Sequence, residues 1–187
     1  MKTLLKFSFA ALFFALIFTD GTQAQERGGS NGLSPDAAVS QTIFNTTNIS
    51  VTYGRPGLKG RDITTLVPEG EIWRAGANEA TTITFSTDVK FGGKDVPAGT
   101  YVLYLLSGET PVFILNKDLK REDGSPTWGA YTYNKASDVV RVPAKSTNFE
   151  ASNMERFMIY FEALTDTSTD MVLHWGNVKS TVTISIN

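Results

Sequence analysis

The segment IWRAGANEATTITF, residues 72–85, changes character at its middle. In its second half Thr82 and Thr84 alternate with Ile83 and Phe85, which is the pattern of a β-strand with one buried face. Its first half instead places a tryptophan, an arginine, an asparagine and a glutamate among glycine and alanine. Small residues let polar side chains lie close to a neighbouring backbone. The segment therefore predicts a strand joined to a compact polar cluster.

Short apolar runs separated by turn residues recur on both sides of this segment. They predict strands at 48–53, 82–85, 89–91, 100–106, 111–115, 139–142, 157–161, 171–175 and 178–186. Gly92 and Gly93 predict a two-residue hairpin turn, and the run 100–106 is apolar on both faces, as in a central strand. A helical turn or short strand is predicted at 63–67, and a short helix near Met154. The pattern predicts an all-β, single-domain antiparallel β-sandwich of jelly-roll or Greek-key type.

The N-terminus has the pattern of a secretory signal peptide. Lys2 and Lys6 supply the positive charge, residues 4–18 are almost wholly apolar, and small residues precede an expected cleavage after Ala24. A membrane anchor is disfavoured because the apolar run is shorter than the roughly 20 residues of a membrane-spanning helix. We therefore predict a signal peptide at 1–24, a flexible polar tether at 25–38 and the β-sandwich domain at 39–187.

Charge and cysteine content narrow the choice of partners and compartment. Loss of Lys2, Lys6 and Asp20 with the signal peptide changes 17 basic and 19 acidic residues to 15 and 18, a net charge of −3. A nucleic-acid partner is therefore not expected. The chain has no cysteine, so it has neither disulfides nor the lipidated cysteine of a bacterial lipoprotein. We expect a periplasmic or extracellular protein without a membrane span after signal cleavage.

Seven residues form the candidate ligand-binding set: Arg55, Arg61, Trp73, Arg74, Asn78, Glu79 and Trp128. Arginine forks suit carboxylates, and indole faces suit sugar rings or aliphatic ligands. The alternative is structural: a buried arginine–glutamate network would pin the loop 54–61 onto the sheet. In that arrangement Glu79 pairs with Arg74 or with an arginine of the loop, and Trp73 packs beside the pair.

The sequence assigns no residue to catalysis, to a metal or to a cofactor. His174 is the single histidine and lies within a predicted strand, where a structural hydrogen bond is expected, and a His/Cys zinc site is excluded without cysteine. No Gly-x-Ser-x-Gly motif accompanies His174, and Asp166 and Asp170 lack EF-hand spacing. One catalytic alternative stays open, a small hydrolase with Glu79 or His174 as acid–base group, although Glu79 has no obvious second carboxylate.

Six motifs extend over most of the chain after the predicted tether: YGRP at 53–56, KGR at 59–61, LVP at 66–68, WRAGANEAT at 73–81, PAGTY at 97–101 and WGAY at 128–131. Together they resemble the signature of the family called domain of unknown function 2911, with WRAGANEAT as the most specific block. The resemblance implies an exported single-domain protein of the Bacteroidota type, and it implies no activity. We therefore expect a non-catalytic exported module that binds a glycan, an envelope component or another small molecule.

Overall fold

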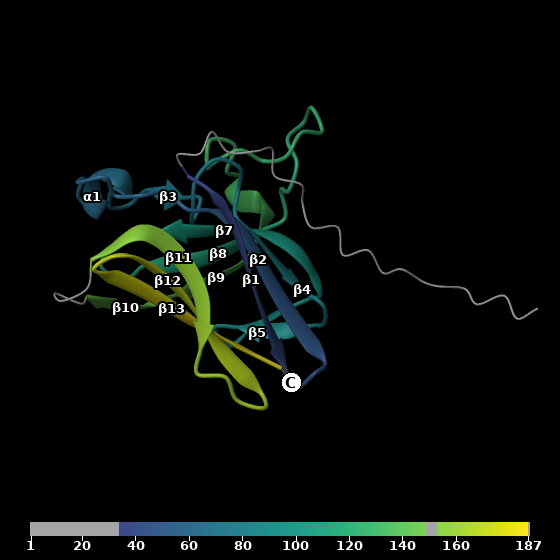
Figure 1. Ribbon diagram of the computed structural model, residues 1–187. Helices are drawn as coiled ribbons and strands as arrows, with labels where there is room; N and C mark the ends of the chain where they lie inside the picture. The colour runs from purple at the N-terminus through teal and green to yellow at the C-terminus, as the bar shows by residue number, and fades with distance from the viewer. Residues whose placement is uncertain (1–33, 149–152, 187) are drawn as a thin grey trace, which may run out of the picture.

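The computed structural model describes residues 34–148 and 153–186, which form two antiparallel sheets packed face to face (Figure 1). The first sheet contains β1 (Asp36–Ile43), β2 (Thr47–Gly54), β3 (Ile72–Trp73), β4 (Thr82–Phe85), β7 (Gly99–Leu106), β8 (Val112–Asn116) and β9 (Asp138–Pro143). The second contains β5 (Val89–Phe91), β6 (Lys94–Val96), β10 (Lys145–Asn148), β11 (Met154–Glu162), β12 (Ser168–Gly176) and β13 (Val178–Ser185). Helical structure in these residues is limited to α1 (Ile63–Leu66) and the 3-10 helix η1 (Lys135–Ser137).

The order of the strands confirms the predicted β-sandwich. It is β1-β2-β4-β7-β8-β9 in the first sheet, with β3 paired to β7, and β11-β12-β13-β5-β6 in the second, with β10 paired to β13. The chain leaves the first sheet after β4, forms the β5–β6 hairpin in the second sheet, and returns to the first sheet at β7. The predicted signal peptide lies outside the described residues, as does most of the predicted tether.

The observed elements confirm two of the local predictions and contradict a third. Gly92 and Gly93 join β5 to β6, and both have the positive φ that a two-residue turn of this kind requires. The central position of β7 is also confirmed, because its neighbours cover it on both edges and apolar layers cover both faces. The expected helix near Met154 is wrong. Met154 begins β11 and pairs with Gly176, since the alternation that buries Phe157 and Ile159 belongs to a strand.

Aromatic side chains dominate the core between the sheets. Phe85 lies 6.3 Å from Phe91 and 6.1 Å from Tyr101, and Phe91 contacts Phe113 edge-on with 6.1 Å between the ring centres. These rings come from β4 and β7–β8 on one side and from β5 on the other, so the core joins the two sheets directly. In a chain without cysteine, this buried apolar surface is the main source of stability.

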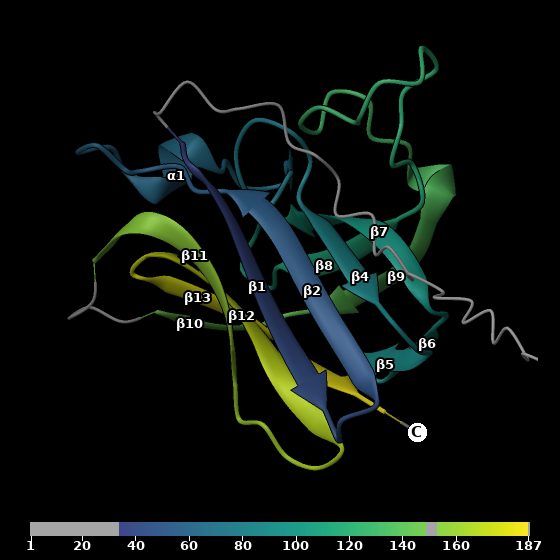
Figure 2. The ribbon, with the colours of Figure 1, turned by 45° about the vertical axis from the view of Figure 1, so that its right-hand side comes forward.

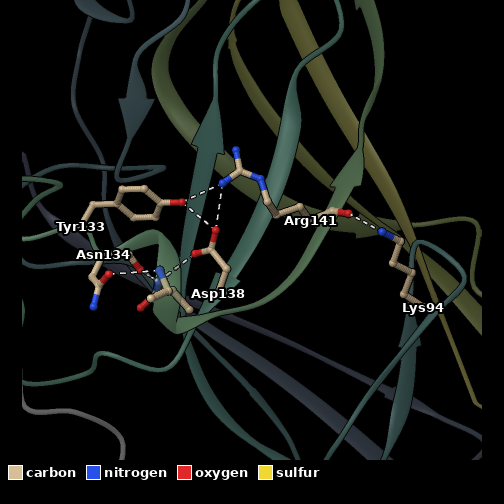
Figure 3. Close-up of polar contacts among 7 residues, drawn as sticks. Lys94, Tyr133, Asn134, Asp138 and Arg141 are labelled. Carbon is tan, nitrogen blue, oxygen red and sulfur yellow. Dashed lines mark hydrogen bonds and ion pairs between the residues drawn. The ribbon is translucent and has the colours of Figure 1, made fainter.

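The edges of the two sheets lie beside one another, β1 beside β11 and β6 beside β9 (Figure 2). The hydroxyl of Tyr53, on β2, donates to the carbonyl of Ile159 over 3.2 Å and accepts from its amide over 3.0 Å. On the other side, Lys94 Nζ donates to the carbonyl of Arg141 over 2.9 Å (Figure 3). Side chains therefore occupy backbone groups that the edge strands β11 and β9 leave outside their ladders.

A long loop covers the outer face of the first sheet. This covering loop, residues 117–134, extends beyond β7–β9 and is drawn in green in Figure 1. Its residues Leu119, Ala130 and Tyr133 pack against a second apolar cluster, which includes Val102, Tyr104 and Ile114 together with Ala80. The covering loop is rich in charged and turn residues, but these three side chains pack over the apolar cluster and cover it.

A polar network fixes the end of the covering loop to β9 (Figure 3). The Tyr133 hydroxyl donates to Asp138 Oδ2 over 2.7 Å, and Arg141 Nη1 donates to both groups over 2.7 and 2.8 Å. Asn116 Nδ2 donates to Asp138 Oδ1 over 2.8 Å and to the Asn134 carbonyl over 2.9 Å. Burial and the hydrogen bond to the Asp138 carboxylate raise the pKa of Tyr133 to about 12.

We expect Tyr133→Phe to lower the free energy of unfolding by about 1–2 kcal/mol, because it removes a hydroxyl bonded to two charged groups. Tyr131→Phe is the matched control, since Tyr131 is 82% exposed and should change stability by less than about 0.5 kcal/mol. Urea unfolding of the two variants measures the difference. Equal effects would contradict an anchoring role for the network.

Candidate functional site

The WRAGANEAT segment interrupts a β-ladder. Trp73 pairs with Leu105 of β7, and Thr82 pairs with Val102 of the same strand. The eight residues 74–81 therefore lie opposite only Leu103 and Tyr104, and most of them leave the ladder as an excursion. Thr81 already rejoins β7, because its carbonyl accepts from the amide of Leu103 over 2.8 Å. The short strands β3 and β4 thus act as one interrupted strand beside β7, with the excursion between them.

Two glycines allow the excursion to pack against the end of β2. A Cβ atom at Gly54 would overlap the carbonyl oxygen of Ala77, and one at Gly76 would lie 2.7 Å from Thr81 Oγ1. The Thr81 hydroxyl donates to the carbonyl of Ala75 over 2.8 Å, which closes the excursion on itself. Ala75 has a φ of 47°, an unusual backbone conformation for a residue with a side chain. The small residues in this stretch are therefore required by close backbone contacts.

Trp73 and Arg74 are neighbours in the interrupted strand, and their side chains lie on opposite faces of the sheet. Trp73 packs into the core between the sheets, whereas Arg74 contacts the covering loop. Arg74 Nη1 donates to the Asn78 carbonyl over 2.6 Å, and its guanidinium lies 5.7 Å from the centre of the Tyr131 ring. Gly129 makes room for this contact, because a Cβ there would lie 3.0 Å from Arg74 Nη1.

Glu79 and Trp128 join the excursion to the covering loop. They form an isolated antiparallel bridge, and the amide of Ala80 donates to the Thr127 carbonyl over 3.0 Å. Glu79 is 5% exposed, whereas Trp128 is 42% exposed. Four of the candidate residues, Arg74, Asn78, Glu79 and Trp128, therefore lie together beneath and beside the covering loop. The expected pairing of Glu79 with an arginine stays a prediction.

The other candidate arginines belong to the loop that follows β2. Arg55 Nε donates to the carbonyl of Phe157 in β11 over 3.0 Å. Arg61 donates within its own loop, from Nε to the Leu58 carbonyl over 3.0 Å and from Nη2 to the Gly57 carbonyl over 3.1 Å. Arg55 therefore ties this loop to the second sheet, whereas Arg61 fixes the path of the loop itself.

Trp73, the seventh candidate, lines a groove of about 360 Å³ at one end of the sandwich, the end where α1 lies in Figures 1 and 2. Its indole is stacked on that of Trp175, with 5.6 Å between ring centres and 16° between planes, and meets Phe157 edge-on at 4.9 Å. The rest of the apolar lining comes from Leu105, Leu173, Val178, Ile63, Val67 and Pro111. The other surfaces of the groove are formed by Thr64, Glu69, Ser107, Gly108, Glu109, Ser146, Asn148 and Ser180. We name this cavity the aromatic groove.

The candidate set omitted Trp175 and Phe157, which form the aromatic groove with Trp73. Each occupies the inward position of a strand that alternates apolar and polar residues, so the sequence signals burial but not proximity to Trp73. Their proximity depends on the pairing of β3 with the end of β7, and β3 is only two residues long. The sequence held one further signal of this site. Trp73 and Trp175 both lie at the end of a strand, just before a turn that contains glycine.

His174 lies outside the aromatic groove, on the outer face of the second sheet. It is 5% exposed and pairs in register with Met158 of β11 and Lys179 of β13. Burial lowers the pKa of His174, and the neighbouring Lys179 lowers it further. Within residues 34–148 and 153–186, no group of three or more histidine, aspartate or glutamate side chains is arranged to hold a metal ion.

Most of the chain matches one known protein family. It belongs to the family described as protein of unknown function DUF2911, whose model matches residues 34–184. The comparison with curated proteins gave no match, and neither did the comparison with solved structures. Among the described residues, no helix has the length and apolar character needed to cross a membrane.

We expect Glu79→Ala to lower the free energy of unfolding by about 3–5 kcal/mol, because Glu79 is 5% exposed and its loss would leave the predicted arginine partner without a counter-charge. Glu122→Ala, at an exposed position of the covering loop, should change it by less than about 0.5 kcal/mol. Denaturant unfolding compares the two. A loss below about 1 kcal/mol for Glu79→Ala would instead favour a ligand-binding role for this carboxylate.

The lowered pKa of His174 predicts a pH dependence of stability. Because the folded state favours the neutral ring, the contribution of His174 is fully present above its unfolded pKa of about 6.5 and is lost as the pH falls towards its folded pKa. Wild type should therefore lose more stability than His174→Gln between about pH 7.5 and pH 5. Parallel unfolding curves measured across this range would show that His174 does not titrate with folding.

Proposed function

We propose that this protein is an exported, non-catalytic binding module whose ligand site is the aromatic groove. The observation that carries the proposal is the meeting of Trp73, Trp175 and Phe157 in a cavity of about 360 Å³ that opens at one end of the sandwich. Concave sites lined mainly by apolar and aromatic side chains, with a few polar groups, are the usual form of small-molecule sites. Its lining residues come from both sheets and from α1, so the fold holds the site from several directions.

The chemistry of the groove favours a ligand with an apolar part over a glycan. A sugar ring needs an exposed aromatic face, whereas Trp73 and Trp175 cover one face of each other. Trp128 is 42% exposed and offers an indole outside the groove, whereas the groove is lined by three aromatic and several aliphatic side chains. An envelope component with an apolar group fits the groove on the same grounds.

The alternative function, a small hydrolase, would use Glu79 or His174 as its acid–base group. A substrate must reach that side chain, and both residues are 5% exposed and absent from the lining of the aromatic groove. Glu69 and Glu109 do line the groove, so they are the carboxylates that a bound molecule would meet. The location of the carboxylates therefore supports binding in the groove over catalysis at Glu79.

Export is the second part of the proposal and rests on residues 1–24. The basic, apolar and small-residue regions of this segment follow the order of a secretory signal peptide. The absence of cysteine fits a protein that is not lipidated after cleavage. Intact-mass measurement on exported protein tests this part: we expect a mature chain beginning at Gln25, and a mass that still includes residues 4–18 would contradict it.

Binding in the groove can be tested with N-phenyl-1-naphthylamine, an uncharged apolar dye that becomes fluorescent in apolar surroundings. Ser146 lines the groove at an exposed position of β10, so Ser146→Phe should obstruct it and weaken dye binding by about tenfold or more. Ser40→Phe is the matched control, because Ser40 is an exposed serine of β1 that does not line the groove. Equal affinity of the two variants for the dye would contradict the proposed site.

A further inference from the structure

The charged side chains at the aromatic groove are all of one sign. Glu69 and Glu109 line it, and its described lining contains no lysine, arginine or histidine. Glu69 Oε1 lies close to the segment that carries Glu109, because a Cβ on the neighbouring Gly108 would be 4.0 Å from that oxygen. Both carboxylates therefore lie at the same groove, and its potential favours positive charge.

The aromatic wall adds to this preference for positive charge. Trp73, Trp175 and Phe157 contact one another, and aromatic rings carry partial negative charge on their faces. A cation placed near such faces is attracted to them, most strongly by tryptophan. The stacking of Trp73 on Trp175 leaves each indole at most one open face, so the rings add a smaller attraction of the same sign as that of the carboxylates.

Ser180 provides a third, separate indication of a ligand. It is 3% exposed and lines the groove, on the inward face of β13 with Val178 and Val182. Its hydroxyl makes no hydrogen bond to another residue of the described chain. The hydroxyl is not among the fully buried side-chain atoms that lack a partner, so it reaches the space of the groove and can bond to a partner there. A ligand in the groove would supply that partner.

We propose that the aromatic groove binds a small organic cation, an ammonium group carried on an apolar body. The apolar body packs against Leu105, Leu173 and Val178, and the ammonium lies towards Glu69 and Glu109. An N–H of the ligand donates to the Ser180 hydroxyl. This inference rests on the proposed function, because it specifies the ligand class of the same groove.

The test compares three ligands that share an eight-carbon chain and differ in charge: octylammonium, octanol and octanoate. Binding is followed by the fluorescence of Trp73 and Trp175 in a Trp128→Phe background, which removes the third tryptophan of the chain. We expect octylammonium to bind more tightly than octanol, and octanoate to bind most weakly. Added salt should reduce the difference, because Glu69 and Glu109 are exposed and their charges are screened.

Charge-neutralising variants test the role of the two carboxylates. Glu69→Gln and Glu109→Gln should each weaken octylammonium binding by about two- to fivefold, the range expected for an exposed charge pair, and should leave octanol binding unchanged. Glu122→Gln, the control in the covering loop, makes the same change of net charge away from the groove and should have no effect.

Different results would show that the ligand class is wrong and that the binding site is wrong. If octanol and octanoate bind as tightly as octylammonium, or if neither glutamine variant affects octylammonium, the cation preference is overturned while the groove stays a binding site. If none of the three ligands binds and N-phenyl-1-naphthylamine is not obstructed by Ser146→Phe, the proposed function itself is overturned.

Discussion

The close contact between the excursion 74–81 and the end of β2 is the constraint on which the rest of the structure depends. Gly54 and Gly76 leave no space for a Cβ atom, so the two backbones meet at a distance that other residues would prevent. This contact lets Trp73 and Thr82 both pair with β7 although eight residues separate them. The alternation of the strand then directs Trp73 into the sandwich and leaves Arg74 to hold the covering loop.

One short segment thus determines two regions with different physical roles. On the outer face, Arg74, Glu79 and the loop residues around Trp128 form a packed polar joint over a small apolar cluster. On the inner face, Trp73 contributes to a cavity that is open at the end of the sandwich. The first arrangement is closed by contacts between the excursion and the covering loop, whereas the second has the form of a binding site.

The sequence was sufficient for the fold class because most strands have a clear local pattern. These patterns involve only residues close together in the chain. They are the alternation at β2, β4, β11 and β13, the Gly92-Gly93 turn and the run of β7 that is apolar on both faces. The strand β1 is harder to predict, because most of its residues are partly or fully exposed and its apolar pattern is weak. Met154 was misjudged for a related reason, since the start of an edge strand has few buried positions.

The site could be predicted only in part because its residues meet through tertiary pairing. The motif WRAGANEAT identified Trp73, Arg74, Asn78 and Glu79 as unusual, but adjacent residues of a strand point in opposite directions. Trp175 lies 102 residues after Trp73 in the sequence, and only the packing of the two sheets brings their indoles into contact.

The contacts between the edges of the two sheets limit how another chain could pair with them. With Tyr53 capping the backbone of Ile159 and Lys94 capping that of Arg141, neither β11 nor β9 offers these groups to an added strand. Recognition by strand addition, a common way for sheets to bind peptides and to aggregate, is therefore disfavoured at these positions, and contacts with other molecules are directed to the ends and faces of the sandwich.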